Sequence, residues 1–159
     1  MHLSLVEIGL LSAAVVIAVI ALPRCSGGGS GGAVVRASWT LTPGVLNPDV
    51  TQETIATTVC KHGWTRTVRP PVSYTNALKA KGLRQYGLRG PPSAFQEDHL
   101  ISLELGGNPV DPRNLWPEPY PRAAAVDRIE NELNNEVCTG ALTLAEAQRR
   151  ESALKHRDG

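Results

Sequence analysis

A run of seven serine and glycine residues, SGGGSGG at positions 26–32, most constrains how this chain folds. The run offers no side chains that pack, and segments of this composition behave as flexible linkers. The chain has 159 residues, enough for one domain of ordinary size with appendages. The sequence therefore predicts a linker at residues 26–38 followed by a single folded domain at residues 39–155.

The segment before the linker is apolar: residues 8–22 contain neither a charge nor a proline. This stretch is short for a membrane-spanning helix, which needs about 20 residues, and near the upper limit of a signal-peptide core, roughly 7–15 residues. We expect residues 1–25 to be a signal peptide or a membrane anchor, with the domain exported to the periplasm or the exterior. An anchor that leaves the domain in the cytoplasm, which Arg24 favours, and an incorrectly assigned start codon stay open.

The domain divides into a basic and an acidic part. Residues 61–96 contain seven lysines and arginines and no acid, whereas residues 97–151 contain eleven acids and five arginines. Such a division suits a protein that binds phosphates with one part and places carboxylates with the other, although the net charge of +1 alone neither favours nor excludes a polyanionic partner. Ordinary exposed surface is the alternative for each residue. The candidates for phosphate contacts are Arg66, Arg69, Arg84 and Arg89.

Three helices are predicted from local signals. Ser73 is a candidate N-cap for a helix at residues 74–86, which Gly87 would close. A row of apolar residues at i, i+3, i+7 and i+11 predicts a second helix that ends at Gly140. Thr143 and Glu146 form a capping-box pattern for a final helix that continues into residues 149–154, and we expect residues 155–159 to fray. The apolar row consists of Val126, Ile129, Leu133 and Val137.

The residues that carry chemistry precede the second helix. An extended run begins at EDHLI (residues 97–101), and LELGG (residues 103–107) continues it into a paired-glycine turn. A loop at residues 108–113 then leads to NLWP at residues 114–117 and to the helix. The order is strand, glycine turn, loop, strand and helix. A neutral histidine such as His99 accepts a proton from water near pH 7, and a neighbouring carboxylate such as Asp98 binds a cation.

The segments EDHLISLELGG, DPRNLWPEP, DRIENEL and VC resemble the HNH (ββα-metal) endonuclease superfamily, and specifically small bacterial HNH-like proteins with a DHLxxLELGG…NLWPEP motif. The resemblance covers about residues 47–150. It implies an α+β fold, with a small ββα-metal core at residues 97–138 and flanking helices. It also implies metal-dependent hydrolysis of phosphodiester bonds in DNA or RNA, without a small-molecule cofactor. Asp98 would bind the metal, His99 would be the general base, and Asn114 would orient the base. The metal would be Mg²⁺ or Mn²⁺ rather than Zn²⁺.

One departure from the family pattern concerns the second metal ligand. HNH proteins usually supply a histidine or asparagine from the start of the helix, where this chain has RAAAV at residues 122–126. Asp127 is our candidate substitute, with Glu118 or Glu130 acting through water as alternatives. A degenerate site is the other interpretation. The chain would then be a catalytically silent HNH-like domain that binds nucleic acid or protein, or a structural module without chemistry.

The family resemblance also bears on the cysteines. Relatives carry counterparts of Cys60 and Cys138, and an exported protein would join them in a disulfide. A zinc site built from these two cysteines and His62 is the alternative, although it lacks an obvious fourth ligand. Cys25 is left without a predicted partner.

Overall fold

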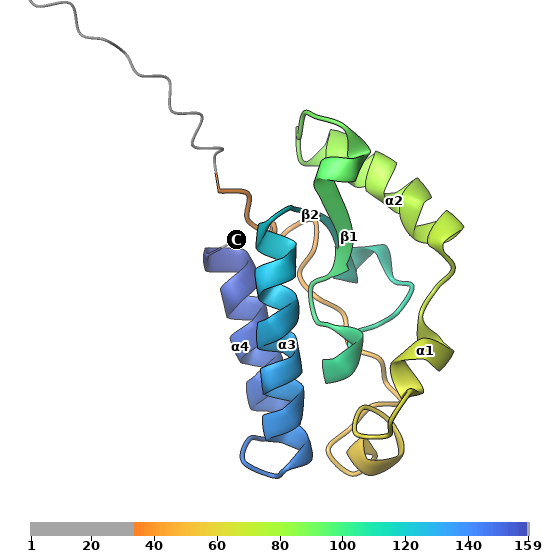
Figure 1. Cartoon of the computed structure of the whole chain (residues 1–159), viewed down its shortest axis with the longest axis vertical. Helices are drawn as coiled ribbons and strands as arrows, with labels where there is room; N and C mark the ends of the chain where they lie inside the picture. Colours follow the sequence, from red (N-terminus) through yellow and green to blue (C-terminus); the bar gives the residue numbers. More distant parts are fainter. Residues whose placement is uncertain (1–33, 159) are drawn as a thin grey trace, which may run out of the picture. The chain divides into compact units, whose positions relative to one another are not determined.

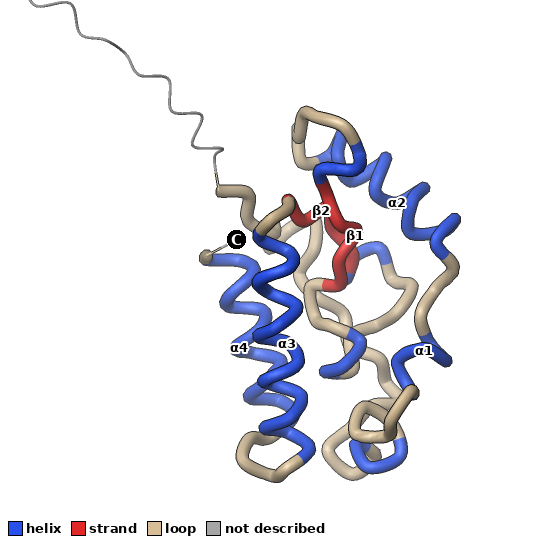
Figure 2. Tube along the Cα trace, in the orientation of Figure 1, coloured by secondary structure: helices blue, strands red, loops and turns tan. Residues whose placement is uncertain are grey.

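A computed structural model describes residues 34–158 of the chain. Its only sheet among these residues is a pair of antiparallel strands, β1 (Phe95–His99) and β2 (Leu115–Pro119), in which Asp98 lies opposite Trp116. The pair lies between the helix α2 (Val72–Gln85) on one side and the helices α3 (Arg122–Cys138) and α4 (Leu144–Arg157) on the other (Figures 1 and 2). A short helix, α1 (Trp64–Val68), precedes α2. This mixture of helix and sheet confirms the α+β class.

The two helices that follow the strands have the predicted residues at their ends: a glycine after α3 and a threonine N-cap before α4. Within the apolar row on α3, Leu133 and Val137 are buried in the main core, Val126 is also buried, and Ile129 packs half-buried against the core. Gly140 takes the left-handed conformation (φ 78°) just after the helix ends. Thr143 is the N-cap of α4, where its hydroxyl accepts a hydrogen bond from the Glu146 backbone N–H at 3.2 Å. Both predictions are confirmed, because caps and end glycines act through the local backbone alone.

Two local predictions were wrong. α2 begins at Val72, directly after Pro71, so Ser73 lies in its first turn and is not the N-cap. Residues 103–105 form a 3₁₀ turn and do not continue the strand, because the chain has to reverse within a few residues. Gly107 is indispensable in this reversal, since a Cβ there would lie 1.7 Å from the carbonyl oxygen of Ile101.

The predicted fraying of the C-terminus was also wrong. Helix α4 continues to Arg157, and both Lys155 and His156 are buried. The backbone N–H of Ala37, itself buried, donates to the carbonyl of Lys155 at 3.0 Å. The ring of Trp39 stacks on His156 with 3.5 Å between ring centroids. Folded structure therefore includes Ala37 before residue 39 and the end of α4 after residue 155.

A disulfide joins Cys60 to Cys138, which are 78 residues apart in sequence, with 5.5 Å between their Cα atoms. It ties the loop before α1 to the last residue of α3. Both sulfur atoms are used in this bond, so the alternative zinc site with His62 does not form.

The predicted signal peptide or anchor at residues 1–25, including Cys25, and the first part of the linker lie outside the described residues. Between residues 34 and 158, no helix is both long enough and apolar enough to cross a membrane.

Candidate active site

His99 is the last residue of β1, and its ring is almost fully buried, with 5% of the residue exposed. Its Nε2 lies 3.1 Å from the carbonyl oxygen of Pro109. A carbonyl only accepts hydrogen bonds, so Nε2 carries the proton and Nδ1 keeps a free lone pair in the neutral ring. Burial lowers the pKa of His99, although the Pro109 carbonyl and Asp98 oppose the shift. His99 is therefore a neutral proton acceptor at pH 7.

Asn114 fixes the loop that contains this carbonyl. The amide is fully buried at the entry to β2, and its Oδ1 accepts from the backbone N–H of Ile101 at 2.9 Å. Its Nδ2 donates to the carbonyl oxygens of Ile101 and Asn108, each at 3.0 Å. Because Pro109 follows Asn108, the Asn114 amide positions the backbone that orients His99.

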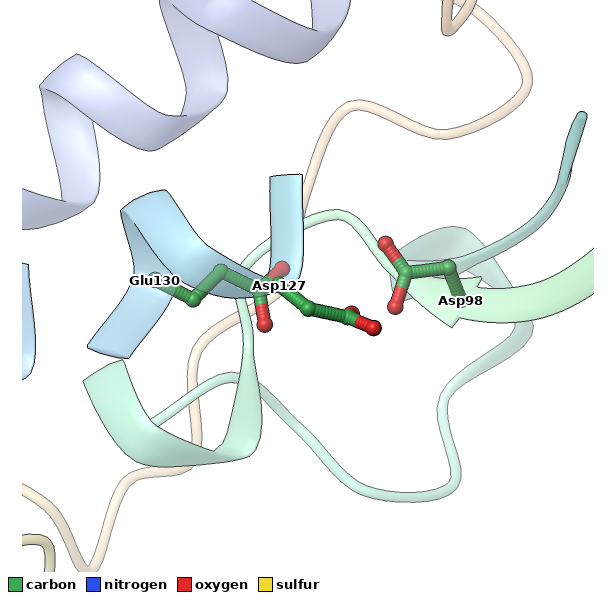
Figure 3. Close-up of side chains that lie close together, drawn as sticks. All are labelled: Asp98, Asp127 and Glu130. Carbon is green, nitrogen blue, oxygen red and sulfur yellow. The ribbon is translucent and has the colours of Figure 1, made fainter. Parts of the chain in front are cut away.

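Three carboxylates meet beside His99. Asp98 comes from β1, whereas Asp127 and Glu130 come from successive turns of α3 (Figure 3). One oxygen of each lies within 4.8 Å of the others. Asp127 also accepts a hydrogen bond from Gln96 Nε2 at 3.2 Å. An all-oxygen donor set of this size fits Mg²⁺ or Mn²⁺, so the residues present suit the group that the sequence resemblance implies.

Lys155 adds a cation to the same cluster, and none of the sequence motifs indicates it. The ammonium of Lys155, from α4, lies 2.7 Å from Asp98 Oδ2, 2.6 Å from Glu130 Oε1 and 3.2 Å from Glu151 Oε1. It also donates to the backbone carbonyl of His99 at 2.5 Å. Lys155 is fully buried. Burial alone would lower the pKa of Lys155, but the surrounding carboxylates raise it well above its usual value. The side chain is thus a permanent positive charge.

A signal for this lysine was present in the sequence. Residues 144, 147, 151 and 155 have the same i, i+3, i+7 and i+11 spacing as the apolar row on α3. All four are buried on one face of α4, the last two being Glu151 and Lys155. Extending this helical spacing beyond Ala147 predicts that Glu151 and Lys155 lie on the buried face of the helix.

The cluster contains more acid than Lys155 neutralises. Burial raises the pKa of Asp98, but Lys155 and the Glu118 side chain outweigh it, and the pKa ends below its usual value. Burial raises the pKa of Glu130 well above the usual range and also raises that of Glu151, with Lys155 opposing both shifts. Burial, aided by Asp98, raises the pKa of Glu118 to about 8. Part of the cluster is therefore protonated at neutral pH, and a bound cation would displace those protons.

His99 and the three carboxylates open into one cavity of about 310 Å³. Arg69 is the one predicted phosphate-binding arginine that lines it, whereas Arg66, Arg84 and Arg89 are exposed elsewhere on the described surface. A second cavity, of about 370 Å³, shares the lining residues Glu104 and Asn131 with the first. The full lining of the first cavity is Arg69, Gln96, Asp98, His99, Ser102, Leu103, Glu104, Asp127, Glu130 and Asn131.

Comparison of the chain with protein-family models, with curated proteins and with solved structures gave no match.

Glu97, the neighbour of Asp98 on β1, gives the domain a pH-dependent stability. Burial raises its pKa from 4.5 to about 8, with Lys79 opposing the shift and Asp98 adding to it. The folded state then binds this proton more tightly than the unfolded state. The resulting stabilisation is complete below the unfolded pKa and is lost as the pH rises through the folded pKa.

We expect Glu97→Gln, which cannot ionise, to unfold at higher urea concentration than the wild type at about pH 9, by more than about 1.4 kcal/mol, the value of one pKa unit. At about pH 4, below the unfolded pKa, the difference between the two proteins should nearly vanish. Glu132→Gln, on an exposed position of α3, is the matched control for the removal of one carboxylate. Parallel pH profiles for wild type and Glu97→Gln would contradict the assignment.

Proposed function

We propose that this chain is a metal-dependent endonuclease of the HNH (ββα-metal) type, with His99 as the general base. The observation that carries the proposal is the shared cavity, in which a neutral His99 with a free Nδ1 lies beside three carboxylates that suit one divalent cation. The strand, loop, strand and helix order around it agrees with the ββα core that the sequence motif implies.

The residues of the site have separate roles in phosphodiester hydrolysis. His99 takes the proton from the attacking water at Nδ1, while Pro109 and Asn114 keep the ring oriented. Asp98, Asp127 and Glu130 would hold a divalent cation, whose chemistry is to neutralise the charge that develops on the phosphate. Arg69, at the cavity wall, binds a non-bridging phosphate oxygen.

The substrate is a nucleic acid strand, DNA or RNA. Lys61 and His62 line the second cavity, so basic side chains continue beyond the first one. We expect cleavage with little sequence preference.

Metal dependence tests the proposal. With Mg²⁺ or Mn²⁺ the protein should convert supercoiled plasmid to the nicked form, and excess chelator should lower the rate by about 100-fold or more, because the charge on the phosphate is then unopposed. Restoring the cation should restore the rate. Asp127→Asn should behave like chelator treatment, whereas the exposed Asp49→Asn should not. Nicking at the same rate in chelator would refute the proposal.

A catalytically silent HNH-like domain that binds nucleic acid or protein is the second candidate. The ammonium of Lys155 favours it, because a fixed cation already contacts two of the three carboxylates. This alternative predicts salt-sensitive DNA binding without cleavage in any divalent metal.

A further inference from the structure

The residue that the proposed mechanism does not use is Lys155, although it makes the closest contacts in the site. Its ammonium has no exposed surface, and its neighbours are three carboxylates and one backbone carbonyl at 2.5–3.2 Å. A buried ammonium costs several kcal/mol in lost hydration, so it persists only where such oxygens surround it. The structure thus already holds one cation among the acids.

The contacts of Lys155 are selective. It touches Asp98 and Glu130, two of the three candidate metal ligands, and uses one oxygen of each. A carboxylate has two oxygens, and the second oxygen of Asp98 and of Glu130 makes no ion pair with the ammonium. Asp127, the third candidate ligand, has no contact with Lys155 and lies at the cavity.

The lysine is itself held firmly. Glu151, one turn earlier on α4, contacts the ammonium at 3.2 Å and accepts two hydrogen bonds from the backbone N–H of Ser102, at 2.9 and 3.0 Å. Ala37 binds the carbonyl of Lys155. These contacts fix the ammonium relative to β1 and α3, from which the candidate ligands come.

We propose that Lys155 is a positioning residue: its ammonium is a built-in cation that holds Asp98 and Glu130 in place and confines a divalent metal to the cavity side of the cluster, next to Asp127. This inference rests on the proposed metal-dependent function. A lysine that served only as a core ion pair would stabilise the fold and leave metal affinity unchanged.

Lys155→Met separates the two roles, because methionine keeps most of the volume and removes the charge. Mn²⁺ binding, measured by titration with detection of the free ion, should become about threefold tighter or more, since a repelling charge has left the cluster. Plasmid nicking should slow by about tenfold or more, because the metal can now move into the ammonium position, away from the phosphate. Tighter binding together with slower cleavage is the expected signature.

Lys155→Met leaves buried carboxylates without their partner charge, which destabilises a fold strongly. A second variant therefore repeats the test with less risk of unfolding. Lys155→Met combined with Glu151→Gln keeps the net charge of the wild type, and the glutamine carbonyl still accepts from the Ser102 N–H. Neither substitution alters the proposed metal ligands. Arg149→Met removes a positive charge from the exposed side of α4 and is the matched control. Its Mn²⁺ affinity and nicking rate should match those of the wild type.

The outcomes distinguish this inference from the proposed function. One outcome is that the wild type neither binds Mn²⁺ nor nicks DNA, whereas the double variant binds Mn²⁺. The nuclease proposal then fails, and the inference that Lys155 acts as a built-in cation is supported. If Mn²⁺ affinity in the folded variants equals that of the wild type or falls below it, the positioning role of Lys155 is overturned. If affinity rises and the nicking rate is unchanged, Lys155 does not direct the metal and the inference is likewise overturned.

Discussion

Replacing His99 by alanine is expected to lower the rate of plasmid nicking by about 100- to 10,000-fold, the usual contribution of a positioned general base. The ring is neutral at pH 7 because burial lowers its pKa, and Nδ1 is its free acceptor because Nε2 binds the Pro109 carbonyl. Alanine leaves the water without a proton acceptor. Single-turnover nicking at saturating Mg²⁺ measures this loss without interference from product release.

Two controls make the His99 result specific. Glu132→Ala removes an exposed side chain of α3 that lines neither cavity, and this variant should retain the wild-type rate. Imidazole added to His99→Ala should restore part of the activity, because the missing ring leaves space beside the cavity. Thermal unfolding should show that the variant remains folded. A folded His99→Ala protein that nicks as fast as the wild type would remove the histidine from the mechanism.

Much of the site could be predicted from the sequence because its residues are close together in the chain. Asp98 and His99 are neighbours, and the glycine turn returns the chain to Asn114 within fifteen residues. A hairpin of this length has few ways to pair, so the strand order and the following helix were predictable. Asp127 lies beside Asp98 because it is on the first turns of α3, and its role as a metal ligand stays a prediction.

Lys155 and Glu151 were not predicted because charged residues are rarely buried, and a long helix near a terminus is usually assigned to the surface. Their burial depends on contacts between residues far apart in sequence. Lys155 contacts Glu130, which is 25 positions earlier, and Asp98, which is 57 positions earlier. The spacing of residues on α4 indicates which of its faces is buried, but it does not identify the carboxylates on β1 and α3 that Lys155 contacts. Arg69 could not be separated from the other arginines for the same reason: its place at the cavity depends on where α1 packs.

Asn114→Ala is expected to have the largest effect on stability, about 3–5 kcal/mol, out of the 5–15 kcal/mol typical of a whole domain. The substitution leaves the Ile101 N–H and the carbonyls of Ile101 and Asn108 without their present partner, and each buried unpaired group costs about 1–3 kcal/mol. Urea unfolding followed by circular dichroism measures the loss. The exposed Asn76→Ala, on α2, is the matched control and should change stability by less than about 0.5 kcal/mol.

Asn114→Ala should also slow nicking. Two causes can be distinguished: loss of the orientation of the His99 ring, and a smaller fraction of folded protein. Releasing Asn108 frees the adjoining Pro109 carbonyl, so the His99 ring loses the partner that fixes its Nε2–H tautomer. At a temperature where the variant is still fully folded, the nicking rate should therefore fall by about tenfold or more, while Mn²⁺ affinity stays within about twofold because the three carboxylates do not contact Asn114. A rate that falls only in proportion to the unfolded fraction would show that the amide holds the loop but does not orient the base.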